Sequence, residues 1–543
     1  MVSDKEWKEH FPEDTEDKEE SKEEIQTALD TIKKYVHKLF TDEYATPHAV
    51  IPTDDHLEVF SIDSRKFKWW CRMMIYNKDG KNINTPALSD LCSLLSAYAQ
   101  FENKEEINLN LRFASQEKNR EQEWIYDLTN KNWEFVKITS RGWRIIKNEI
   151  IFRRHSNQQT QVDPLQKYEP DVFDRFMKLV NIKQNNEELK LLLKCYIVSL
   201  FIPGIQKPIL MLHGSQGSAK SSLQEMIKML VDPSLVKTFS FPRDINELIQ
   251  QLSHNQVVFY DNISTIPDYI SDQLCRAVSG SGSSKRKLYS DDDDVIYNFK
   301  RIVGFNGINL GATKPDLLDR GLIIELERID ENKQLKPEDL WKQFEELRPQ
   351  LLGYIFDILV KVLRWKNDPN APKLNLTRLP RMAEFAEYGE MISRCMGNPG
   401  NLFMNAYYDN IKLQSQEVLD SSIVATSISY FMTNRNDEDW IGNATQLLSE
   451  LEEQAEVLKI NTKNRLWPKA PHTLSRRLNE IKTNLRQIGL ELKIDRSGRQ
   501  RIIKICKIPS LASLPSLDQN QAQIDSKFND ATDNATEYSV TQI

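Results

Sequence analysis

Residues 208–222 place a short apolar run directly before a loop rich in glycine and serine, and this loop ends in Lys220 and Ser221. An apolar run that stops at glycine predicts a buried strand, a turn and then the start of a helix. The backbone N–H groups of such a turn point inward, and the helix N-terminus adds positive charge at the same spot. The order therefore predicts a phosphate-binding loop, and the alternative is a chance turn before a helix.

The residues of this loop have separate expected roles. Lys220 would reach the β- and γ-phosphates and the Ser221 hydroxyl would hold Mg²⁺, so the expected ligands are ATP and Mg²⁺. Ala219 stands where the motif G-x-x-x-x-G-K-[ST] has its last glycine, and its methyl group is tolerated if the residue has helical φ. The candidate nucleotide-binding residues are Gly214, Ser215, Gln216, Gly217, Ser218, Ala219, Lys220, Ser221 and Ser222.

Length and composition limit the possible classes of protein. The chain has 543 residues, which suggests about three domains. Its net charge of −7 means that any DNA-binding surface must be local. The six cysteines are far apart and lack metal-ligand or redox spacing, so we expect a reducing cytoplasm. The longest apolar stretch, Leu191–Ile205, is too short to span a bilayer and predicts a buried helix, and the charged N-terminus is no signal peptide.

Changes of pattern divide the chain into segments. Residues 1–22 look disordered or frayed, and Glu23–Phe40 has helical spacing of apolar residues. We expect strands near 57–62, 107–113, 123–128, 133–138 and 143–152, with a helix near 85–98. The predicted organisation is an acidic, helical extension (1–44), a strand-rich domain (45–154), a polar linker (155–170), an α/β core with preceding helices (171–335), a helical lid (336–432), a basic C-terminal domain (433–507) and a disordered tail (508–543).

A second nucleotide-binding element is predicted at Gln256–Asn262, where an apolar run ends in Asp261. A buried strand that ends in an acid is a common structural feature, but its place after Lys220 favours a carboxylate that holds Mg²⁺ through water. Many ATPases have glutamate at the next position, as the base that orients water. Asn262 stands there instead, and an amide can position water but cannot accept its proton. Hydrolysis is then slow, or another group helps.

Two further residues belong to the predicted catalytic set. Ile302–Asn306 is an apolar run that ends in an amide, and a strand beside the first two would place Asn306 against the γ-phosphate. Arg320 precedes another apolar run, in a position from which it could face a neighbouring subunit. An arginine supplied in trans neutralises transition-state charge, although alone it would be a surface ion-pair residue.

In this order the elements resemble an AAA+ ATPase. The segments Asp272–Gly280, Ser284–Tyr297 and Arg381–Glu390 are more specific, and resemble the replicative helicases of mobile elements, phages and plasmids. Among these helicases the chain is similar to the MCM-like helicase of staphylococcal cassette chromosomes. The resemblance implies an AAA+ P-loop core with a helical lid and a homo-hexameric ring that translocates on single-stranded DNA. It also implies that Arg381, at the start of a lid helix, senses the γ-phosphate, against a surface arginine as the alternative.

The resemblance also implies a hairpin aimed into the ring channel, with strands near 285–289 and 295–299. Lys285, Arg286 and Lys287 supply positive charge suited to a phosphate backbone. The four acids Asp291–Asp294 at its tip would repel DNA, and either pair with a neighbouring subunit or cap the turn. The alternative is a plain solvated hairpin.

The C-terminal domain has the pattern of a winged helix. A helix over 473–488 has Leu474, Leu478, Ile481 and Leu485 on one face, and two strands follow around a turn at 496–499. The local excess of basic residues favours DNA, although winged helices also dock proteins. The candidate DNA-binding residues are Arg476, Arg477, Arg496, Arg499 and Arg501.

The strand-rich N-terminal domain contains tryptophans close to basic residues. Such a combination can form a platform for single strands, but strand-rich domains also bury tryptophan, and we expect most of these rings in the core.

Three functions therefore compete. The leading one is an ATP-driven DNA helicase of a mobile element, acting on single-stranded and forked DNA with accessory replication or primase proteins as possible partners. The second is an ATP-switched origin-binding initiator without processive unwinding. The third, a protein-remodelling AAA+ enzyme, leaves the basic C-terminus unexplained.

Overall fold

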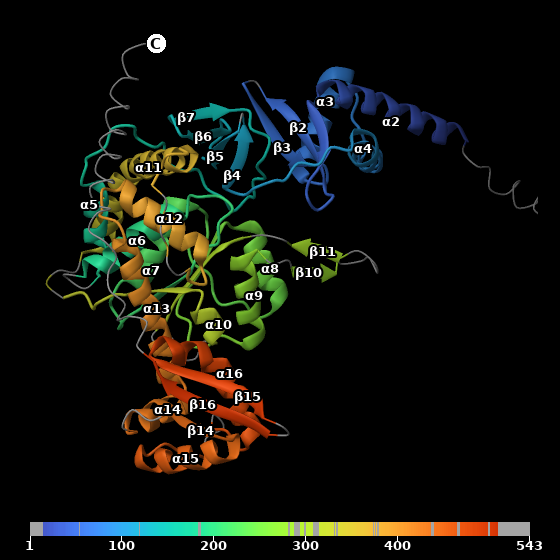
Figure 1. The fold of residues 1–543 in the computed structure, drawn as a ribbon. Helices are drawn as coiled ribbons and strands as arrows, with labels where there is room; N and C mark the ends of the chain where they lie inside the picture. The colour runs from blue at the N-terminus through green and yellow to red at the C-terminus, as the bar shows by residue number, and fades with distance from the viewer. Residues whose placement is uncertain are drawn as a thin grey trace, which may run out of the picture.

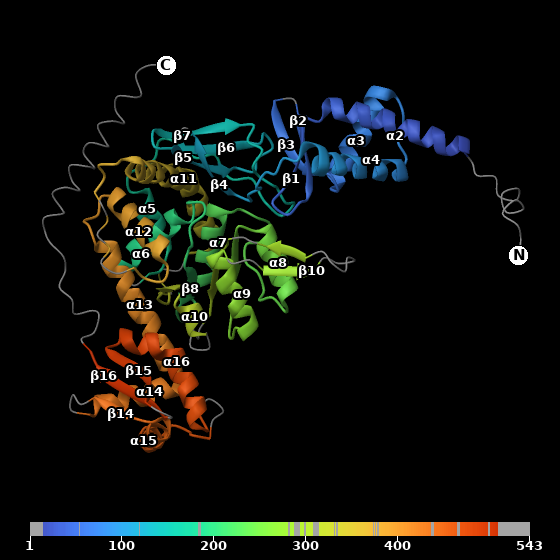
Figure 2. The ribbon, with the colours of Figure 1, turned by 45° about the vertical axis from the view of Figure 1, so that its right-hand side comes forward.

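The computed structural model describes residues 15–53, 55–118, 120–182, 186–280, 283–286, 294–297, 300–307, 314–330, 332, 335–372, 374, 376, 379–435, 439–463, 467–497 and 500–508. A central body carries an N-terminal lobe at one end and a C-terminal lobe at the other (Figures 1 and 2). The predicted disorder of residues 1–14 and of the tail from residue 509 lies outside the described residues.

The central body is built on a parallel sheet with the strand order β13-β8-β12-β9. Its strands are short runs of Val, Ile, Leu and Phe that are buried almost throughout, which is typical of parallel sheets covered by helices. β12 pairs with both β8 and β9, as expected for the strand that ends in Asn306. The strands are β8 (Ile209–His213), β9 (Val257–Tyr260), β12 (Ile302–Asn306) and β13 (Gly321–Glu325).

Helices surround this sheet (Figure 1). α6 carries most of the long apolar stretch and is buried, as predicted. The helices are α5 (Val172–Leu179), α6 (Glu187–Ser199), α7 (Lys220–Val231), α8 (Ile245–His254), α9 (Asp268–Ser279), α10 (Pro315–Leu318), α11 (Pro337–Asn367), α12 (Ala383–Cys395) and α13 (Leu402–Ser421). Among the described residues no helix is long and apolar enough to cross a membrane.

The N-terminal lobe contains two antiparallel sheets rather than one strand-rich unit. The first, β1-β2-β3, packs with α2, α3 and α4 around its own core, and the second, β4-β5-β6-β7, joins the core of the central body. The elements are α2 (Thr15–Tyr35), β1 (Lys38–Thr41), β2 (Pro47–Thr53), β3 (His56–Ser61), α3 (Arg65–Asp79), α4 (Thr85–Ala97), the π-helix η1 (Tyr98–Asn103), β4 (Phe113–Lys118), β5 (Glu121–Asp127), β6 (Glu134–Thr139) and β7 (Gly142–Lys147).

Two local expectations for this lobe are wrong, and one helix was not predicted. Residues 15–22 are helical rather than frayed, because they form the first two turns of α2. Within residues 107–112 only Asn110 forms an isolated bridge, with Phe152, and the strand begins at Phe113. α3 was not predicted, because apolar residues on its outer face hide the helical spacing of Phe67, Cys71 and Ile75.

A buried ion-pair network joins the second N-terminal sheet to the central body. The Arg112 guanidinium is fully buried and donates through Nε to Asp232 Oδ1 (2.9 Å), which lies just after α7. Lys228 Nζ donates to Asp232 Oδ2 (2.9 Å). Each buried charge thus has a partner, as burial requires.

Residues 155–170 are packed against the central body rather than a free linker. The Gln161 amide is buried and donates to Tyr126 Oη (2.8 Å) and the Leu230 carbonyl (2.8 Å). Its polar composition suggested a solvated segment, but these groups are satisfied by hydrogen bonds in the interior.

The C-terminal lobe forms three helices and a three-stranded antiparallel sheet in the order β14-β16-β15. Its longest helix, α16, buries Leu474, Leu478, Ile481 and Leu485, which confirms the predicted apolar face. α14, which the sequence placed in the preceding helical segment, packs on α15 and α16. The elements are α14 (Ile423–Thr433), β14 (Trp440–Gly442), α15 (Ala444–Val457), α16 (Pro471–Gln487), β15 (Leu490–Ser497) and β16 (Gln500–Lys507).

Candidate nucleotide-binding and DNA-binding sites

The loop over residues 214–219 connects β8 to α7, as the apolar run before it predicted. Gly214 has φ of 144°, and a Cβ atom on it would lie 2.2 Å from the Leu326 carbonyl oxygen. Only glycine allows the chain to turn there against the backbone after β13. All nine candidate nucleotide-binding residues lie in this loop or in the first turn of α7.

Ala219 does not have the helical φ on which the tolerance of its methyl group depended. This residue has φ of 60° and ψ of 30°, which is the left-handed region. In that conformation the alanine Cβ is crowded by the carbonyl oxygen, at a cost of about 1–2 kcal/mol that glycine avoids. The chain therefore keeps the turn that the motif's last glycine normally makes, with alanine in its place.

Lys220 begins α7 and turns its side chain back over the loop. Its Nζ donates to the carbonyl oxygens of Gly214 (2.8 Å) and Ser215 (2.7 Å). Desolvation lowers the pKa of Lys220, and the Asp261 carboxylate acts in the opposite direction. The ammonium group is thus held at the loop, within the influence of the predicted metal-binding carboxylate.

Ser221, Asp261 and Asn306 meet at the carboxyl ends of adjacent strands. Asp261 Oδ1 accepts hydrogen bonds from Ser221 Oγ (2.8 Å) and from Asn306 Nδ2 (2.7 Å). Asn306 is buried, whereas Asp261 is half-buried and directly follows β9. The structure therefore brings together three residues that are far apart in the sequence and that the motifs placed at one site.

Two neighbours complete this cluster. The backbone N–H of Asn262 donates to Asn306 Oδ1 (2.7 Å), and Asn262 itself has φ of 55° and is exposed. Gln224 Oε1 accepts from Asn306 Nδ2 (2.8 Å). Sequence reasoning missed Gln224, although its place one helical turn after Ser221 was an available signal.

Arg320 lies at the opposite edge of the sheet from the loop. It directly precedes β13, its carbonyl accepts from the Ile209 N–H (2.8 Å), and β13 runs parallel to β8. β8 is five residues long, so the strand separates Arg320 from the loop by roughly 16 Å. The structure thus does not bring Arg320 to the phosphate loop of its own chain.

Arg381 is also away from the loop, because it shares an acidic partner with Arg320. Arg320 Nη1 and Arg381 Nη2 both lie 2.5 Å from carboxylate oxygens of Asp316. Burial raises the pKa of Asp316, but Arg320, Cys275 and Arg381 together outweigh it and lower the pKa overall. Asp316 was missed by sequence reasoning, and its position four residues before Arg320 was the only local signal.

The residues at the loop fit a nucleotide with magnesium. Gly214 keeps the loop free of side chain, and a serine hydroxyl beside a carboxylate is the oxygen chemistry that Mg²⁺ prefers. Within the described ranges no group of three or more His, Cys, Asp or Glu residues could hold a metal ion. Mg²⁺ would therefore take most of its ligands from phosphate and water.

Two protein-family models match the chain and together span more than half of it. The first, "Actinomycete integrative conjugative element replication protein", matches residues 173–402, and the second, "AICE RepA C-terminal domain", matches residues 424–520. The two matches identify the chain as a replication protein of a mobile genetic element. The second match begins at the start of α14, where the C-terminal lobe begins.

Other comparisons add little to this identification. No match was found among curated proteins. An A-form apo structure of the NrS-1 C-terminal region shares 11% identity at a TM-score of 0.38, covering 88% of this chain and 97% of that chain. A second apo structure of the same region, residues 305–718, shares 11% identity at a TM-score of 0.35 with the same coverage. At such TM-scores these likenesses carry no weight for what the replication protein does.

The predicted hairpin of the replication protein is present as β10 (Ser283–Arg286) and β11 (Asp294–Tyr297). The strands are antiparallel, and Lys285 pairs with Val295. The acidic residue Asp294 lies on β11 instead of in the turn. Lys287 and the tip residues 291–293 lie outside the described residues. The hairpin projects from the central body in both ribbon views (Figures 1 and 2).

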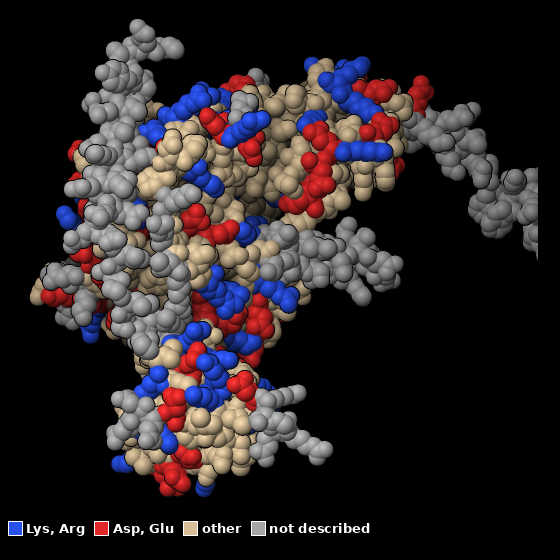
Figure 3. All heavy atoms as spheres, viewed as in Figure 1, with Lys and Arg blue, Asp and Glu red and all other residues tan. Residues whose placement is uncertain are grey.

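The C-terminal lobe of the replication protein carries the other predicted basic residues. Arg476 is exposed on α16 near Glu480 (4.0 Å), and Arg477 is half-buried on the same helix. Arg496 and Arg501 are cross-strand partners in the β15–β16 hairpin, and Arg499 falls outside the described residues. Figure 3 shows Lys and Arg side chains gathered on this lobe, with Asp and Glu among them.

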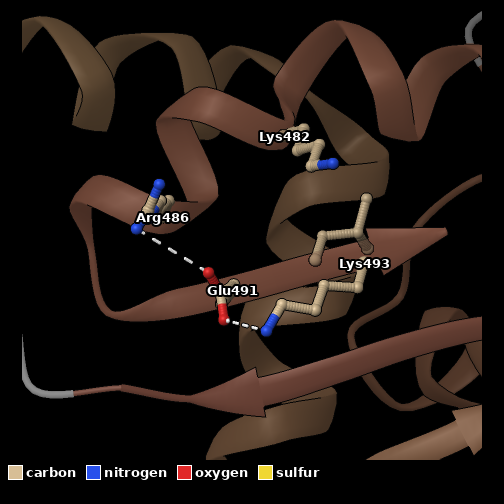
Figure 4. A pocket seen from close by; sticks show the side chains of 5 residues that line it. Lys482, Arg486, Glu491 and Lys493 are labelled. Atoms are coloured by element: carbon tan, nitrogen blue, oxygen red, sulfur yellow. Dashed lines mark ion pairs between the residues drawn. The ribbon is translucent and has the colours of Figure 1, made fainter.

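A shallow pocket on this lobe was not predicted as a site. Lys482 and Arg486 of α16 line it together with Glu491, Leu492 and Lys493 of β15 (Figure 4). Glu491 accepts from Lys493 Nζ (3.0 Å) and lies 3.8 Å from Arg486 Nη2. Three basic groups around one carboxylate leave a net positive surface between helix and hairpin.

Proposed function

We propose that this mobile-element replication protein is an ATP-dependent DNA helicase with an AAA+ core. The observation that carries the proposal is the contact of Ser221, Asp261 and Asn306 beside Lys220. This cluster lies at the carboxyl edge of a parallel sheet, which is where such sheets bind ligands. β12 lies between β8, which leads into the phosphate loop, and β9, which leads into Asp261, and this strand order supports the AAA+ assignment.

Each residue of the cluster has a role in this proposal. Ser221 and Asp261 would hold Mg²⁺, and Lys220 would neutralise charge on the β- and γ-phosphates. Asn306 keeps Asp261 in place and orients the backbone at Asn262. The Asn262 amide can position water but cannot accept its proton, so hydrolysis by a single chain is expected to be slow.

The position of the arginines favours a shared site between subunits. Arg320 and Arg381 both bind Asp316, near the edge of the sheet away from the loop. They would therefore act on the nucleotide of a neighbouring copy, as arginines supplied in trans do. We propose a ring of copies, with the hairpins and basic C-terminal lobes directed at DNA.

Strand displacement on forked substrates tests this function. Duplexes with either a 3′ or a 5′ single-stranded tail are incubated with the full chain, ATP and Mg²⁺. The proposal expects unwinding of one polarity and ATP hydrolysis stimulated by single-stranded DNA, with both lost in Lys220→Ala. ATP hydrolysis without separation of either fork would exclude a helicase.

The net positive surface of the C-terminal lobe supports a second candidate, an ATP-switched origin-binding initiator. Phosphate contacts position such a lobe on duplex DNA without reading its sequence. Footprinting on mobile-element DNA distinguishes the two functions. A sequence-specific footprint that persists in Lys220→Arg, together with absent unwinding, would favour the initiator.

A further inference from the structure

An exposed apolar stripe runs along α3 on the N-terminal lobe. Trp69, Met73 and Tyr76 are 65%, 52% and 63% exposed. Their spacing of four and three residues places them on one face of the helix, away from the face that buries Phe67 and Cys71. Three large side chains clustered outside the core do not stabilise the fold, and such clusters mark interaction sites.

Positive charge flanks this stripe. Arg65 and Lys66 are exposed one turn before Trp69, and Arg72 lies three residues after it. Among the described residues none of these three cations has an ion-pair partner, and Arg72 Nη2 donates to the neutral Thr85 hydroxyl (2.9 Å). The only acid of α3 is Asp79, whose carboxylate accepts from Thr31 Oγ1 (2.9 Å).

Other aromatic residues of the lobe lack this combination. Trp124 and Trp133 are buried in the two cores, as the sequence favoured for most tryptophans. Phe101 is 68% exposed, but its neighbour in the chain is Glu102. Exposed rings and unneutralised cations therefore coincide on α3.

We propose that this face of α3 binds single-stranded nucleic acid. Bases would stack on Trp69 and Tyr76, while Arg65, Lys66 and Arg72 contact phosphates. Seven residues of helix separate the two rings by about 10 Å, which matches roughly three nucleotides of a stacked strand. An apolar stripe alone would equally suit a protein, but unneutralised cations on both sides favour a polyanion.

The site goes beyond the helicase proposal, because it requires neither ATP nor unwinding. In both ribbon views the lobe that carries α3 and the β10–β11 hairpin extend to the same side of the central body (Figures 1 and 2). A strand held on α3 could therefore continue toward the hairpin.

Binding of a fluorescently labelled oligo(dT) strand to the full chain, without nucleotide, tests the proposal by anisotropy. Trp69→Ala with Tyr76→Ala should raise the Kd by at least about 25-fold, because each of the two lost stacked bases is expected to contribute about 5-fold or more. Trp69→Phe should retain most of the affinity, since it keeps a ring. Arg65→Glu with Lys66→Glu should weaken binding and reduce its salt dependence. Phe101→Ala is the matched control and should have no effect.

Other basic surfaces of the chain could dominate the affinity that anisotropy measures. Photocrosslinking with an oligonucleotide that carries 5-iodouracil therefore locates the bound strand directly. A crosslinked peptide from residues 65–79, lost in the Trp69→Ala/Tyr76→Ala variant, supports the site. Absence of any crosslink in that peptide overturns it. The proposed site would also be overturned if this variant lost self-association while its DNA binding stayed unchanged and its crosslinks lay elsewhere. That result would assign the stripe to a contact between copies of the chain.

Discussion

Asn306 Nδ2 lies 2.7 Å from Asp261 Oδ1 and donates a hydrogen bond to it. The Oδ1 atom of the same Asn306 amide accepts from the Asn262 backbone N–H (2.7 Å). One buried side chain therefore fixes both the predicted metal-binding carboxylate and the residue that stands in the usual place of a catalytic base.

Asn306→Ala should lower both stability and ATP hydrolysis. The substitution leaves the Asn262 N–H and Gln224 Oε1 without their partner, at a cost of about 1–3 kcal/mol for each group that stays buried. We expect at least a tenfold loss of ATP turnover with smaller loss of nucleotide affinity, measured by steady-state hydrolysis and by binding of a fluorescent ATP analogue. Gln224→Ala, which leaves the Asp261 contact intact, is the control, and turnover as high in Asn306→Ala as in Gln224→Ala would contradict this role.

Ala219→Gly should stabilise the chain. Glycine removes the steric cost of the left-handed conformation at φ of 60° but adds flexibility to the unfolded state, so we expect a net gain of about 0.5–1 kcal/mol. Chemical denaturation measures this gain. Ala219→Val should have the opposite effect, since a β-branched residue is more crowded there, and equal stability of all three chains would show that the turn is unstrained.

Mixing two inactive variants tests the intersubunit site. Lys220→Ala removes the loop lysine, and Arg320→Ala removes the arginine at the other edge of the sheet. In a mixed assembly, some interfaces place the intact loop of an Arg320→Ala chain beside the intact arginine of a Lys220→Ala chain. If Arg320 acts in trans, these interfaces should restore part of the ATPase activity. Each variant alone should be inactive, and Arg320→Ala should still bind ATP.

The mixing experiment has a negative control. A chain with both substitutions, mixed with Lys220→Ala, provides no intact loop lysine in any subunit, so this mixture should stay inactive. Absence of recovery in the first mixture, with both variants shown to co-assemble, would place Arg320 outside the site.

Local patterns predicted much of the fold and the centre of the site. The loop of residues 214–222 and the strands that end in Asp261 and Asn306 were predicted because each is a continuous apolar run followed by a polar residue. The apolar face of α16 was predicted for the same reason. Because these strands pair in parallel, their carboxyl ends lie at the same edge of the sheet, and this brings the polar residues together.

Long-range contacts account for what the sequence did not predict. The φ of Ala219 belongs to a loop packed against the chain after β13, and nothing near residue 219 encodes that packing. The pairing of Asp316 with Arg381 joins segments far apart in the sequence. The packing of residues 155–170 relies on hydrogen bonds of polar groups, which periodicity does not detect.

Stability should fall with acidification because of a buried histidine pair. The rings of His155 and His254 stack with centroids 4.4 Å apart, and His155 Nε2 is buried without a hydrogen bond among the described residues. Burial, then His254, Arg153 and Arg301, lower the pKa of His155 to about 3. The unfolded chain, with a pKa near 6.5, therefore takes up a proton that the native chain does not, and native stability declines as pH falls below about 6.5.

The size of this effect can be isolated by substitution. Each pH unit between the two pKa values costs up to about 1.4 kcal/mol, so His155 should contribute about 1–2 kcal/mol of lost stability between pH 7 and pH 5. His155→Phe keeps a ring for the stack but cannot take up the proton. Urea unfolding at pH 7 and pH 5 should show a larger loss for the natural chain than for His155→Phe, because most carboxylates stay ionised above pH 5. An equal loss of stability in the two chains would mean that His155 takes up its proton in the native state as readily as in the unfolded state.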